Sequence, residues 1–304
     1  MPRVTVLEAI QKSTDFLAKK QVESPRLQTE LLLAHLLKMP RMKLYLNFDR
    51  ELSSVETEAL REAVRRRGQR EPLQHITGST SFCGHEIMVG RDVLIPRPET
   101  ELLAELGWTF LQQRAGSAGP NSFSALDLCT GSGCIAIAIA AKCPAAQLVA
   151  ADVSPAALAI ARVNADRNHL SGRIEFREGD GFQALADLPE RPPARRFDLI
   201  VSNPPYIPSA EIATLDPEVR DFDPGLALDG GTDGLDFYRR LAAGASAHLK
   251  PEGRMMLEFG EGQVEAIKKI MEKQNWIVEA VKEDYSQRAR ILIAKTSPPP
   301  PVTG

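Results

Sequence analysis

Apolar and polar positions alternate along this chain with two different periods, and the change of period divides it into parts. Residues 5–70 follow a helical period, in which leucines and alanines recur every three or four positions without an interrupting strand pattern. Ser24-Pro25 signals the start of one helix, and Ser53-Ser54 signals the start of a second over residues 53–67. Residues 1–75 are therefore predicted to form a small helical domain.

The next segment changes to short apolar runs separated by glycines. Residues 80–95 predict a β-hairpin. The prolines that follow predict an extended entry into a helix that starts at Pro98 and runs to about residue 113. Residues 114–124 are rich in Gly, Ser and Pro and predict a loop. We take residues 76–97 as a linker that contains the hairpin.

Strand and helix patterns alternate from residue 125 onward. The expected strands are 125–129, 147–152, 174–178, 197–202, 254–259, 276–283 and 290–295, and the expected helices start at 133 and 154 or cover 236–249 and 263–274. This alternation predicts an α/β fold with a doubly wound, mostly parallel, seven-stranded Rossmann-like sheet over residues 98–296. The short link between the last two strands predicts an antiparallel hairpin at one edge. The Pro-rich tail, 297–304, is expected to be disordered or polyproline II.

Composition places the chain among ordinary globular proteins. Hydrophobic residues make up 43% and charged residues 25% of its 304 positions. No apolar run could span a membrane, and the N-terminus lacks the pattern of a signal peptide, so we expect a cytoplasmic protein. The four cysteines form no Cys-x-x-Cys pair and the five histidines no His-Glu-x-x-His pattern. We therefore expect neither a disulfide framework nor a metal site.

The net charge of −3 is unevenly distributed. Residues 1–75 carry 14 basic and 10 acidic side chains, whereas the remainder carries 23 and 30. The run Arg65-Arg66-Arg67 fits a solvated helix face better than a partner surface. Because no strongly basic surface is indicated, we expect no direct binding of nucleic acid.

The most informative motif follows the strand expected at 197–202 and reads Asn203-Pro204-Pro205-Tyr206. In open α/β sheets, ligands bind at the carboxyl ends of the strands. The side-chain oxygen of Asn203 and the restrained carbonyl of Pro204 can each accept one N–H of a planar NH2 group, and Tyr206 can stack on that group. The alternative is a strand end followed by a Pro-Pro turn. The motif predicts a site that holds a planar NH2 group in line with an electrophile.

A glycine loop, Asp127-Leu128-Cys129-Thr130-Gly131-Ser132-Gly133, lies between the first strand of the alternating region and its helix. Gly131 and Gly133 allow the backbone to approach a ligand closely, and the start of the helix offers free N–H groups to a carboxylate or phosphate. Asp152 ends the next strand, 19 residues after Gly133, and can accept hydrogen bonds from both hydroxyls of a ribose. The set predicts a nucleoside-bearing cofactor.

The form of the loop narrows the choice of cofactor. It matches neither the dinucleotide fingerprint nor the P-loop, and its shortness leaves room for an amino-acid tail rather than a pyrophosphate, which favours S-adenosylmethionine. Asp180 follows the third strand and can accept from the adenine amino group, with Gly181 and Phe182 beside the ring. A simple turn residue is an equal alternative for Asp180. Asn203 is expected to border the cofactor as well as the acceptor.

Through these motifs, the chain resembles the bacterial release factor glutamine methyltransferases, and the resemblance covers nearly all of residues 20–295. The segments that carry the resemblance are 72–78, 93–101, 223–224, 227–228, 230–235, Asp284 and 288–290. The sequence departs from the family pattern at several places, one of which is Gln287, where Gly usually precedes Arg288. Cys129 stands where Gly is common, Gly181 stands where Trp is frequent, and residues 27–30 read Leu-Gln-Thr-Glu rather than Leu-Asp-Ala-Glu.

The resemblance implies methyl transfer from S-adenosylmethionine to the side-chain amide nitrogen of a glutamine. In the family, this glutamine belongs to the Gly-Gly-Gln motif of class I peptide-chain release factors. The resemblance further implies a class I methyltransferase sheet, with Asn203 and Pro204 holding the acceptor and the helical domain docking the release factor. We expect a monomer. The alternatives are glutamine methylation of a ribosomal protein, adenine-N6 methylation of nucleic acid, and a non-catalytic binding module of the translation apparatus.

Overall fold

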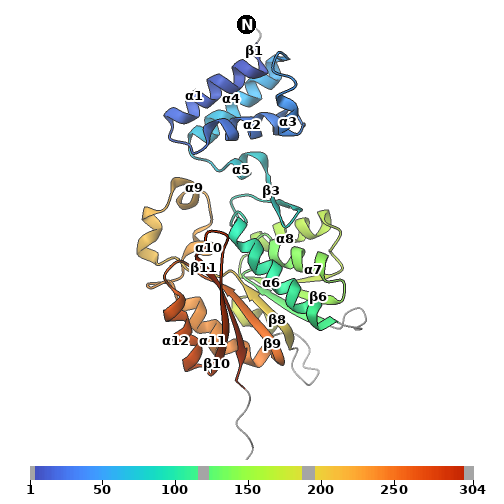
Figure 1. Ribbon diagram of the computed structural model, residues 1–304, viewed down its shortest axis with the longest axis vertical. Helices are drawn as coiled ribbons and strands as arrows, with labels where there is room; N and C mark the ends of the chain where they lie inside the picture. The colour runs from blue at the N-terminus through green and yellow to red at the C-terminus, as the bar shows by residue number, and fades with distance from the viewer. Residues whose placement is uncertain (1–3, 116–122, 187–195, 298–304) are drawn as a thin grey trace, which may run out of the picture. The chain divides into compact units, whose positions relative to one another are not determined.

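The computed structural model describes residues 4–115, 123–186 and 196–297 (Figure 1). Most of the loop expected at 114–124 and nearly all of the Pro-rich tail lie outside these residues. The chain divides into two compact units. The helical unit comprises Met1–Ser79 together with Asp216–Phe222, and the sheet unit comprises Thr80–Leu215 and Asp223–Gly304.

The helical unit is built mainly from three long helices and several short elements. They are β1 (Val4–Thr5), α1 (Val6–Lys19), α2 (Pro25–Leu36), α3 (Arg41–Leu44), β2 (Glu51–Leu52), α4 (Ser54–Gly68), α5 (Leu73–Thr77) and α9 (Pro217–Arg220). Strands β1 and β2 form a two-residue antiparallel ladder. The expectation that no strand interrupts this region was therefore wrong, because two paired residues are too few to show a strand period.

The two expected helix starts are confirmed, with different chemistry at each. Ser53 forms a capping box with Glu56, since the hydroxyl of Ser53 accepts from the Glu56 backbone and the Glu56 carboxylate accepts from the Ser53 backbone. Ser24 makes no side-chain cap. Helix α2 starts after it because Pro25 suits the first helical position.

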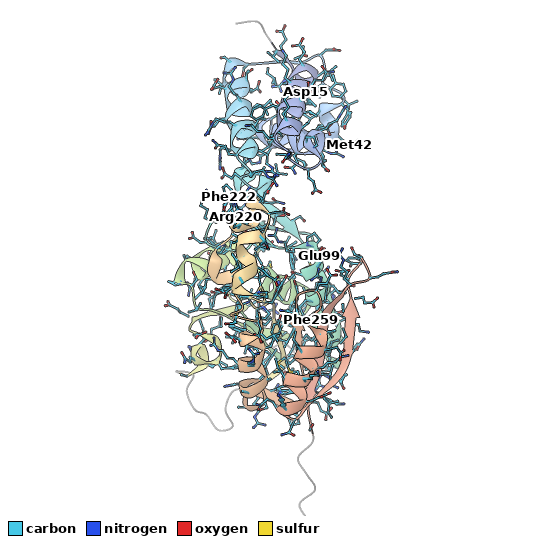
Figure 2. The ribbon with its side chains drawn as sticks, turned by 90° about the vertical axis from the view of Figure 1, so that its left-hand side faces the viewer. Asp15, Met42, Glu99, Arg220, Phe222 and Phe259 are labelled. Atoms are coloured by element: carbon cyan, nitrogen blue, oxygen red, sulfur yellow. The ribbon has the colours of Figure 1, made fainter. Side chains whose placement is uncertain are left out.

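The arginine run at the end of α4 is only partly solvated. Arg65 lies on the surface and pairs with Glu62. Arg67, by contrast, is 4% exposed, and its Nη2 lies 2.8 Å from Oε1 of Glu218, while Nη2 of Arg70 lies 2.6 Å from Oε2 of the same carboxylate. The expected solvated face is thus wrong for Arg67. These pairs bind the segment Asp216–Phe222, on which Figure 2 labels Arg220 and Phe222, into the helical unit.

The sheet unit contains a seven-stranded sheet flanked by helices. Its strands are β5 (Phe123–Leu128), β6 (Ala146–Asp152), β7 (Ile174–Glu178), β8 (Phe197–Ser202), β9 (Leu249–Glu258), β10 (Trp276–Glu283) and β11 (Ala289–Thr296). Its helices are α6 (Pro98–Ala115), α7 (Cys134–Lys142), α8 (Pro155–Arg167), α10 (Gly225–Leu228), α11 (Asp236–His248) and α12 (Val264–Lys273), with 3-10 turns η1 (Gly181–Leu185) and η2 (Ser209–Thr214). The expected hairpin precedes them as β3 (Ser79–Phe82) and β4 (His85–Met88).

The strand order is β10-β11-β9-β8-β5-β6-β7. Strands β5 to β9 are mutually parallel, whereas β11 is antiparallel to both of its neighbours, β9 and β10. The doubly wound, mostly parallel sheet with an antiparallel edge hairpin is therefore confirmed. Strands β6 and β7 follow β5 on one side of the sheet, whereas β9 follows β8 on the other side. The strand order therefore reverses between β5 and β8, and ligands bind at such a point in open α/β sheets.

Both faces of the sheet are covered by helices. On β8, Leu199 and Val201 pack into an apolar cluster shared with α6 and α7, whereas Ile200 packs into a second cluster shared with α11 and α12 (Figure 1). Alternate residues thus face opposite layers, which explains why β8 is an uninterrupted buried run. The two layers leave the carboxyl ends of the central strands as the open edge.

Candidate active site

A cavity of about 690 Å³ lies at the carboxyl ends of β5, β6 and β8. Nine of the site residues expected from the sequence line it: Cys129, Thr130, Gly131, Ser132, Asp152, Asp180, Gly181, Asn203 and Pro205. The structure thus brings the glycine loop and the Asn-Pro-Pro-Tyr motif to one cavity at the point where the strand order reverses. The remaining expected residues, which are Asp127, Gly133, Pro204, Tyr206 and Phe182, are not among its lining residues in the described chain.

Asp127 lies beneath the glycine loop. Its fully buried carboxylate accepts hydrogen bonds from the Thr130 hydroxyl at 2.7 Å and from the Ala136 backbone N–H at 3.2 Å. Burial raises the pKa of Asp127 to about 7. Asp127 therefore joins the loop to the first turn of α7, and its position explains why the loop begins with an acidic residue.

The glycine loop takes a left-handed backbone conformation at three positions. The φ angles are +60° at Cys129, +53° at Gly131 and +81° at Gly133. A side chain at Gly133 would in addition meet the Cβ of Ala161 at 3.1 Å. Cys129 adopts a conformation that favours glycine, which accounts for the frequency of Gly at this position in the family that the sequence resembles. Gly133 gives α7 no side-chain cap and Asp127 accepts the N–H of Ala136, so the N–H groups of the first two residues of α7 remain for an anionic ligand.

Asp152 connects the end of β6 to the same loop. Its Oδ2 accepts from the Gly131 backbone N–H at 2.9 Å and its Oδ1 from the Ser154 backbone N–H at 2.9 Å. Each carboxylate oxygen can accept a further hydrogen bond. Burial raises the pKa of Asp152 above its ordinary value. The residue thus fixes the loop and still offers two acceptors to a ligand with neighbouring hydroxyls.

The region expected to hold an adenine ring differs from the prediction at Phe182. The Phe182 ring stacks on His248, with centroids 4.9 Å apart, and fills the space beside Gly244 on α11. The cavity wall is instead formed by Phe237 and Arg240, which also lie on α11. Sequence reasoning missed both, because nothing local shows which face of α11 meets the cavity.

Asp180 is half exposed and forms an ion pair with the Arg240 guanidinium, at 2.6 Å between Oδ1 and Nη2. That guanidinium also lies over the Phe237 ring, 5.0 Å from its centroid. The backbone of Gly181 is left-handed, with φ of +62°, and a Cβ there would meet Arg240 Nη2 at 3.1 Å. The three side chains and Gly181 together form one polar and aromatic wall of the cavity.

Asn203 follows the end of β8, and its amide is directed to the hydroxyl of Thr100, which also lines the cavity. Its Nδ2 donates to Oγ1 of Thr100 at 3.2 Å, and Thr100 is 3% exposed at the start of α6. Glu258, at the end of β9, is buried, and burial raises the pKa of its carboxyl group to about 7, while the Thr100 and Asn203 side chains act to lower that pKa. Neither Thr100 nor Glu258 was given a role from the sequence, since Thr100 is one of several polar residues in the segment 93–101 and Glu258 is a single polar residue at the end of a strand.

Tyr206 packs into the apolar cluster between the sheet and α11 and α12. Its backbone carbonyl accepts from Nε2 of Gln263 at 2.8 Å. Gly230 and Gly234 lie against the same backbone, and a Cβ at Gly230 would meet the Tyr206 Cα at 2.8 Å. The turn after Asn203 is therefore held by close contacts with residues 230–234, the glycine-rich segment that follows it in the chain.

These donors and acceptors fit a ligand with a carboxylate at one end and ribose hydroxyls in its middle. The carboxylate matches the uncapped N-terminus of α7, and the hydroxyls match Asp152. In the described residues, no group of three or more His, Cys, Asp or Glu could hold a metal ion. No helix within the described ranges is both long and apolar enough to cross a membrane.

Comparisons with known proteins agree with this geometry. Residues 8–78 match the family model of the PrmC N-terminal domain, and residues 109–215 match that of the methyltransferase small domain. The solved structure of SMU.776, complexed with SAH, shares the fold with a TM-score of 0.51 at 14% identity, over 72% of this chain and 56% of that one.

Two relatives match along most of their length. The release factor glutamine methyltransferase of Geobacter sulfurreducens is 44% identical over 263 residues, which are 86% of this chain and 87% of the relative. That of Chlorobaculum tepidum is 42% identical over 289 residues, which are 95% and 96% of the two chains. Likeness over both units, together with a cavity that unites the glycine loop and Asn203, places this chain in the release factor glutamine methyltransferase family.

Proposed function

We propose that this enzyme transfers a methyl group from S-adenosylmethionine to the side-chain amide nitrogen of the glutamine in the Gly-Gly-Gln motif of class I release factors. The observation that carries the proposal is that Asn203 lines the same cavity as Gly131 and Asp152. The names of the relatives support a release factor as the acceptor. The choice of the Gly-Gly-Gln glutamine rests on the family resemblance.

The cofactor would be held by groups that converge on the cavity. The N–H groups of the first two residues of α7 suit its carboxylate, and Asp152 suits its ribose hydroxyls. When bound, S-adenosylmethionine supplies an electrophilic methyl group on a positively charged sulfur. The wall formed by Phe237 and Arg240 borders the part of the cavity next to Asp180, where we place the adenine.

The acceptor amide is a poor nucleophile because its lone pair is delocalised into its carbonyl. Asn203 Oδ1 and the Pro204 carbonyl would each accept one N–H of the NH2 group and so hold its nitrogen in line with the methyl group. The same two hydrogen bonds strengthen as positive charge develops on that nitrogen, so they stabilise the transition state more than the ground state. Pro205 restrains the Pro204 backbone, which keeps that carbonyl in place.

We further propose that the helical unit docks the release factor, because a single side-chain amide offers little surface for recognition. We also propose that the enzyme acts in the cytoplasm, where an acceptor of this kind is used, and that it acts as a monomer. If docking matters, the intact release factor should have a kcat/KM at least tenfold higher than a short Gly-Gly-Gln peptide. Equal values for the two acceptors would argue against a docking role.

The proposal is tested by incubating the enzyme with labelled S-adenosylmethionine and three acceptors. These are a class I release factor, the same factor with the Gly-Gly-Gln glutamine replaced by alanine, and a mixture of ribosomal proteins. Label on the native factor alone would support the proposal. Label on the ribosomal proteins alone, or equal label on both versions of the factor, would overturn it.

A further inference from the structure

The described residues of the sheet unit include five large hydrophobic side chains that are exposed, namely Val153, Val163, Leu226, Ile277 and Tyr285. Tyr285 is 79% exposed and Leu226 is 62% exposed, whereas the other three are between 39% and 44% exposed. Single exposed hydrophobic residues are ordinary on protein surfaces. Leu226 and Tyr285 are distinguished by their position, since both lie at the edge of the sheet that carries the active site.

Leu226 lies at the mouth of the active-site cavity. It belongs to α10 and is among the residues that line the cavity. Two residues later, Leu228 is buried, and its carbonyl accepts from the Ile207 backbone N–H at 3.0 Å. Ile207 directly follows Tyr206 of the Asn-Pro-Pro-Tyr motif, so α10 is attached to the turn that holds the acceptor. This attachment keeps α10 in place while the side chain of Leu226 stays exposed.

Tyr285 reaches the same edge through the register of the sheet. Four paired residues lie level with one another across β8, β9, β11 and β10, and they are Ser202, Leu257, Leu292 and Val281. Since β10 runs in the same direction as β8, Asn203 lies one residue beyond this row and Tyr285 four residues beyond it. Strand β11 is two strands away from β8, which is about 10 Å. The turn between β10 and β11 therefore projects past the level of Asn203, at the same end of the sheet as α10 (Figure 1).

The turn that carries Tyr285 is fixed by the buried carboxylate of Asp284. Its Oδ1 accepts from the backbone N–H groups of Ser286 at 2.8 Å and Arg288 at 3.1 Å, and its Oδ2 accepts from Nε of Arg290 at 3.2 Å. The Asp284 backbone N–H also donates to the Arg288 carbonyl at 2.8 Å. A turn held in this way presents an exposed aromatic ring with little further ordering on binding. Preorganised aromatic side chains of this kind are frequent anchors in protein interfaces.

The charges beside the two side chains are paired within the sheet unit. Arg288, three residues after Tyr285, forms an ion pair with Glu261 at 3.1 Å. Asp223, three residues before Leu226, forms an ion pair with Arg97. The two positions thus offer apolar area and a phenol group rather than charge of one sign. This chemistry fits the apolar side chains of a protein and does not fit the phosphate backbone of a nucleic acid.

We propose that Leu226 and Tyr285 form an acceptor rim, which contacts apolar side chains of the release factor next to its Gly-Gly-Gln loop. This inference rests on the proposed function, in which that loop delivers its glutamine to Asn203. A glutamine side chain is short, so the protein that carries it has to approach the mouth of the cavity closely. Neither rim residue takes part in methyl transfer, so their loss should weaken acceptor binding and leave the rate of the bound complex unchanged.

The test compares wild type with Leu226→Ala, Tyr285→Ala and the double variant. Two controls shorten exposed hydrophobic residues elsewhere in the sheet unit: Val163→Ala lies on α8 and Ile277→Ala lies near the start of β10, at the opposite end of the hairpin from Tyr285. The values of kcat and KM for intact release factor are measured with saturating S-adenosylmethionine. Isothermal titration without cofactor gives the dissociation constant of the release factor, and a separate titration gives that of the cofactor.

For each rim variant we expect KM and the dissociation constant of the release factor to rise by at least about fivefold, and for the double variant by at least about twentyfold. The kcat and the cofactor affinity should stay within about twofold of wild type, as should every value for the two controls. Tyr285→Phe, which keeps the ring, should bind the release factor more tightly than Tyr285→Ala.

The inference is overturned if the rim variants bind the release factor as tightly as the controls, or if they lose kcat or cofactor affinity instead of acceptor affinity. A wild-type enzyme inactive on release factors would instead overturn the proposed function, and this inference with it.

Discussion

Arg97 forms an ion pair with Asp223, at 2.7 Å between Nη2 and Oδ2. Arg97 belongs to the segment at 93–101 that carries the family resemblance, and it lines the cavity. The Asp223 side chain is fully buried and immediately precedes the cavity-lining segment that begins at Pro224. The pair thus joins two segments that are far apart in sequence and fixes one wall of the active site.

Removal of the Arg97 charge should loosen this wall. In Arg97→Gln, Asp223 loses its cation while it stays buried, so we expect the free energy of unfolding to fall by about 1–3 kcal/mol. This loss is smaller than for a fully buried pair because Arg97 is partly exposed. Urea unfolding at pH 7 measures the loss. Lys268→Gln removes an equally exposed cation whose partner, Glu265, is exposed, and it should change stability by less than about 0.5 kcal/mol. Equal effects of the two substitutions would show that the pair does not hold the segment.

Asn203→Ala should affect turnover far more than cofactor binding. It removes one acceptor for the glutamine NH2 group, and loss of one such transition-state contact lowers kcat by about 10²–10³-fold. Single-turnover methyl transfer gives the rate, and isothermal titration gives the cofactor affinity, which should change by no more than about twofold. A variant that transferred methyl groups at the wild-type rate would show that Asn203 does not position the acceptor.

Asp152→Ala should show the opposite pattern. It removes both the proposed ribose acceptors and the hydrogen bond that fixes the Gly131 backbone. Hydrogen bonds to a charged group contribute about 1.5–3 kcal/mol each, so we expect the dissociation constant of S-adenosylmethionine to rise by at least about tenfold. Isothermal titration measures this, with Asp166→Ala, on the exposed side of α8, as the control. Unchanged affinity would contradict the placement of the ribose.

The pKa of Glu258 also predicts how stability depends on pH. Because the folded-state pKa is raised from 4.5 to about 7, the folded state favours the neutral acid. The stability that this acid contributes is fully present below pH 4.5 and is lost as the pH rises to about 7. Glu258→Gln should therefore become more stable than wild type by up to about 3 kcal/mol between pH 5 and pH 8. Urea unfolding at several pH values checks this, and a difference independent of pH would mean that Glu258 is already ionised at pH 5.

Gly230→Ala should disturb the turn that carries Tyr206. The added Cβ would lie 2.8 Å from the Tyr206 Cα and 2.9 Å from the Gly234 backbone, so backbone atoms have to move. We expect a loss of kcat of at least about tenfold together with a loss of about 1–3 kcal/mol in stability. Gly172→Ala, at an exposed position outside the cavity lining, is the control, because a Cβ there meets nothing within 4 Å. Equal activity of the two variants would show that the turn tolerates displacement.

The positions of several strands could be predicted from the sequence, although only β8 among them is buried along its whole length. Strands β7, β8 and β10 begin and end at the expected residues, because the apolar run of β8 and the alternating apolar and charged positions of β7 and β10 stop at polar or glycine-rich turns. The meeting of Gly131, Asp152 and Asn203 at one cavity was predictable too, since the carboxyl ends of parallel strands share one edge of a sheet.

The parts that could not be predicted depend on distant contacts. Thr100 lies in the segment 93–101 that carries the family resemblance, but its contact with Asn203 appears only when α6 meets the end of β8. Phe182 was misplaced because its sequence neighbours do not reveal the space beside Gly244. Arg67 belongs to a charge run typical of a solvated face, and its burial depends on Glu218, which lies 151 residues away in the chain.

The most direct test of the account is mass-spectrometric mapping of the methyl group on a class I release factor after incubation with the enzyme and S-adenosylmethionine. We predict a gain of one methyl group on the side-chain amide of the Gly-Gly-Gln glutamine with wild-type enzyme, and at least about a hundredfold slower gain with Asn203→Ala. Methylation of any other residue, or an equal rate with the two enzymes, would contradict it.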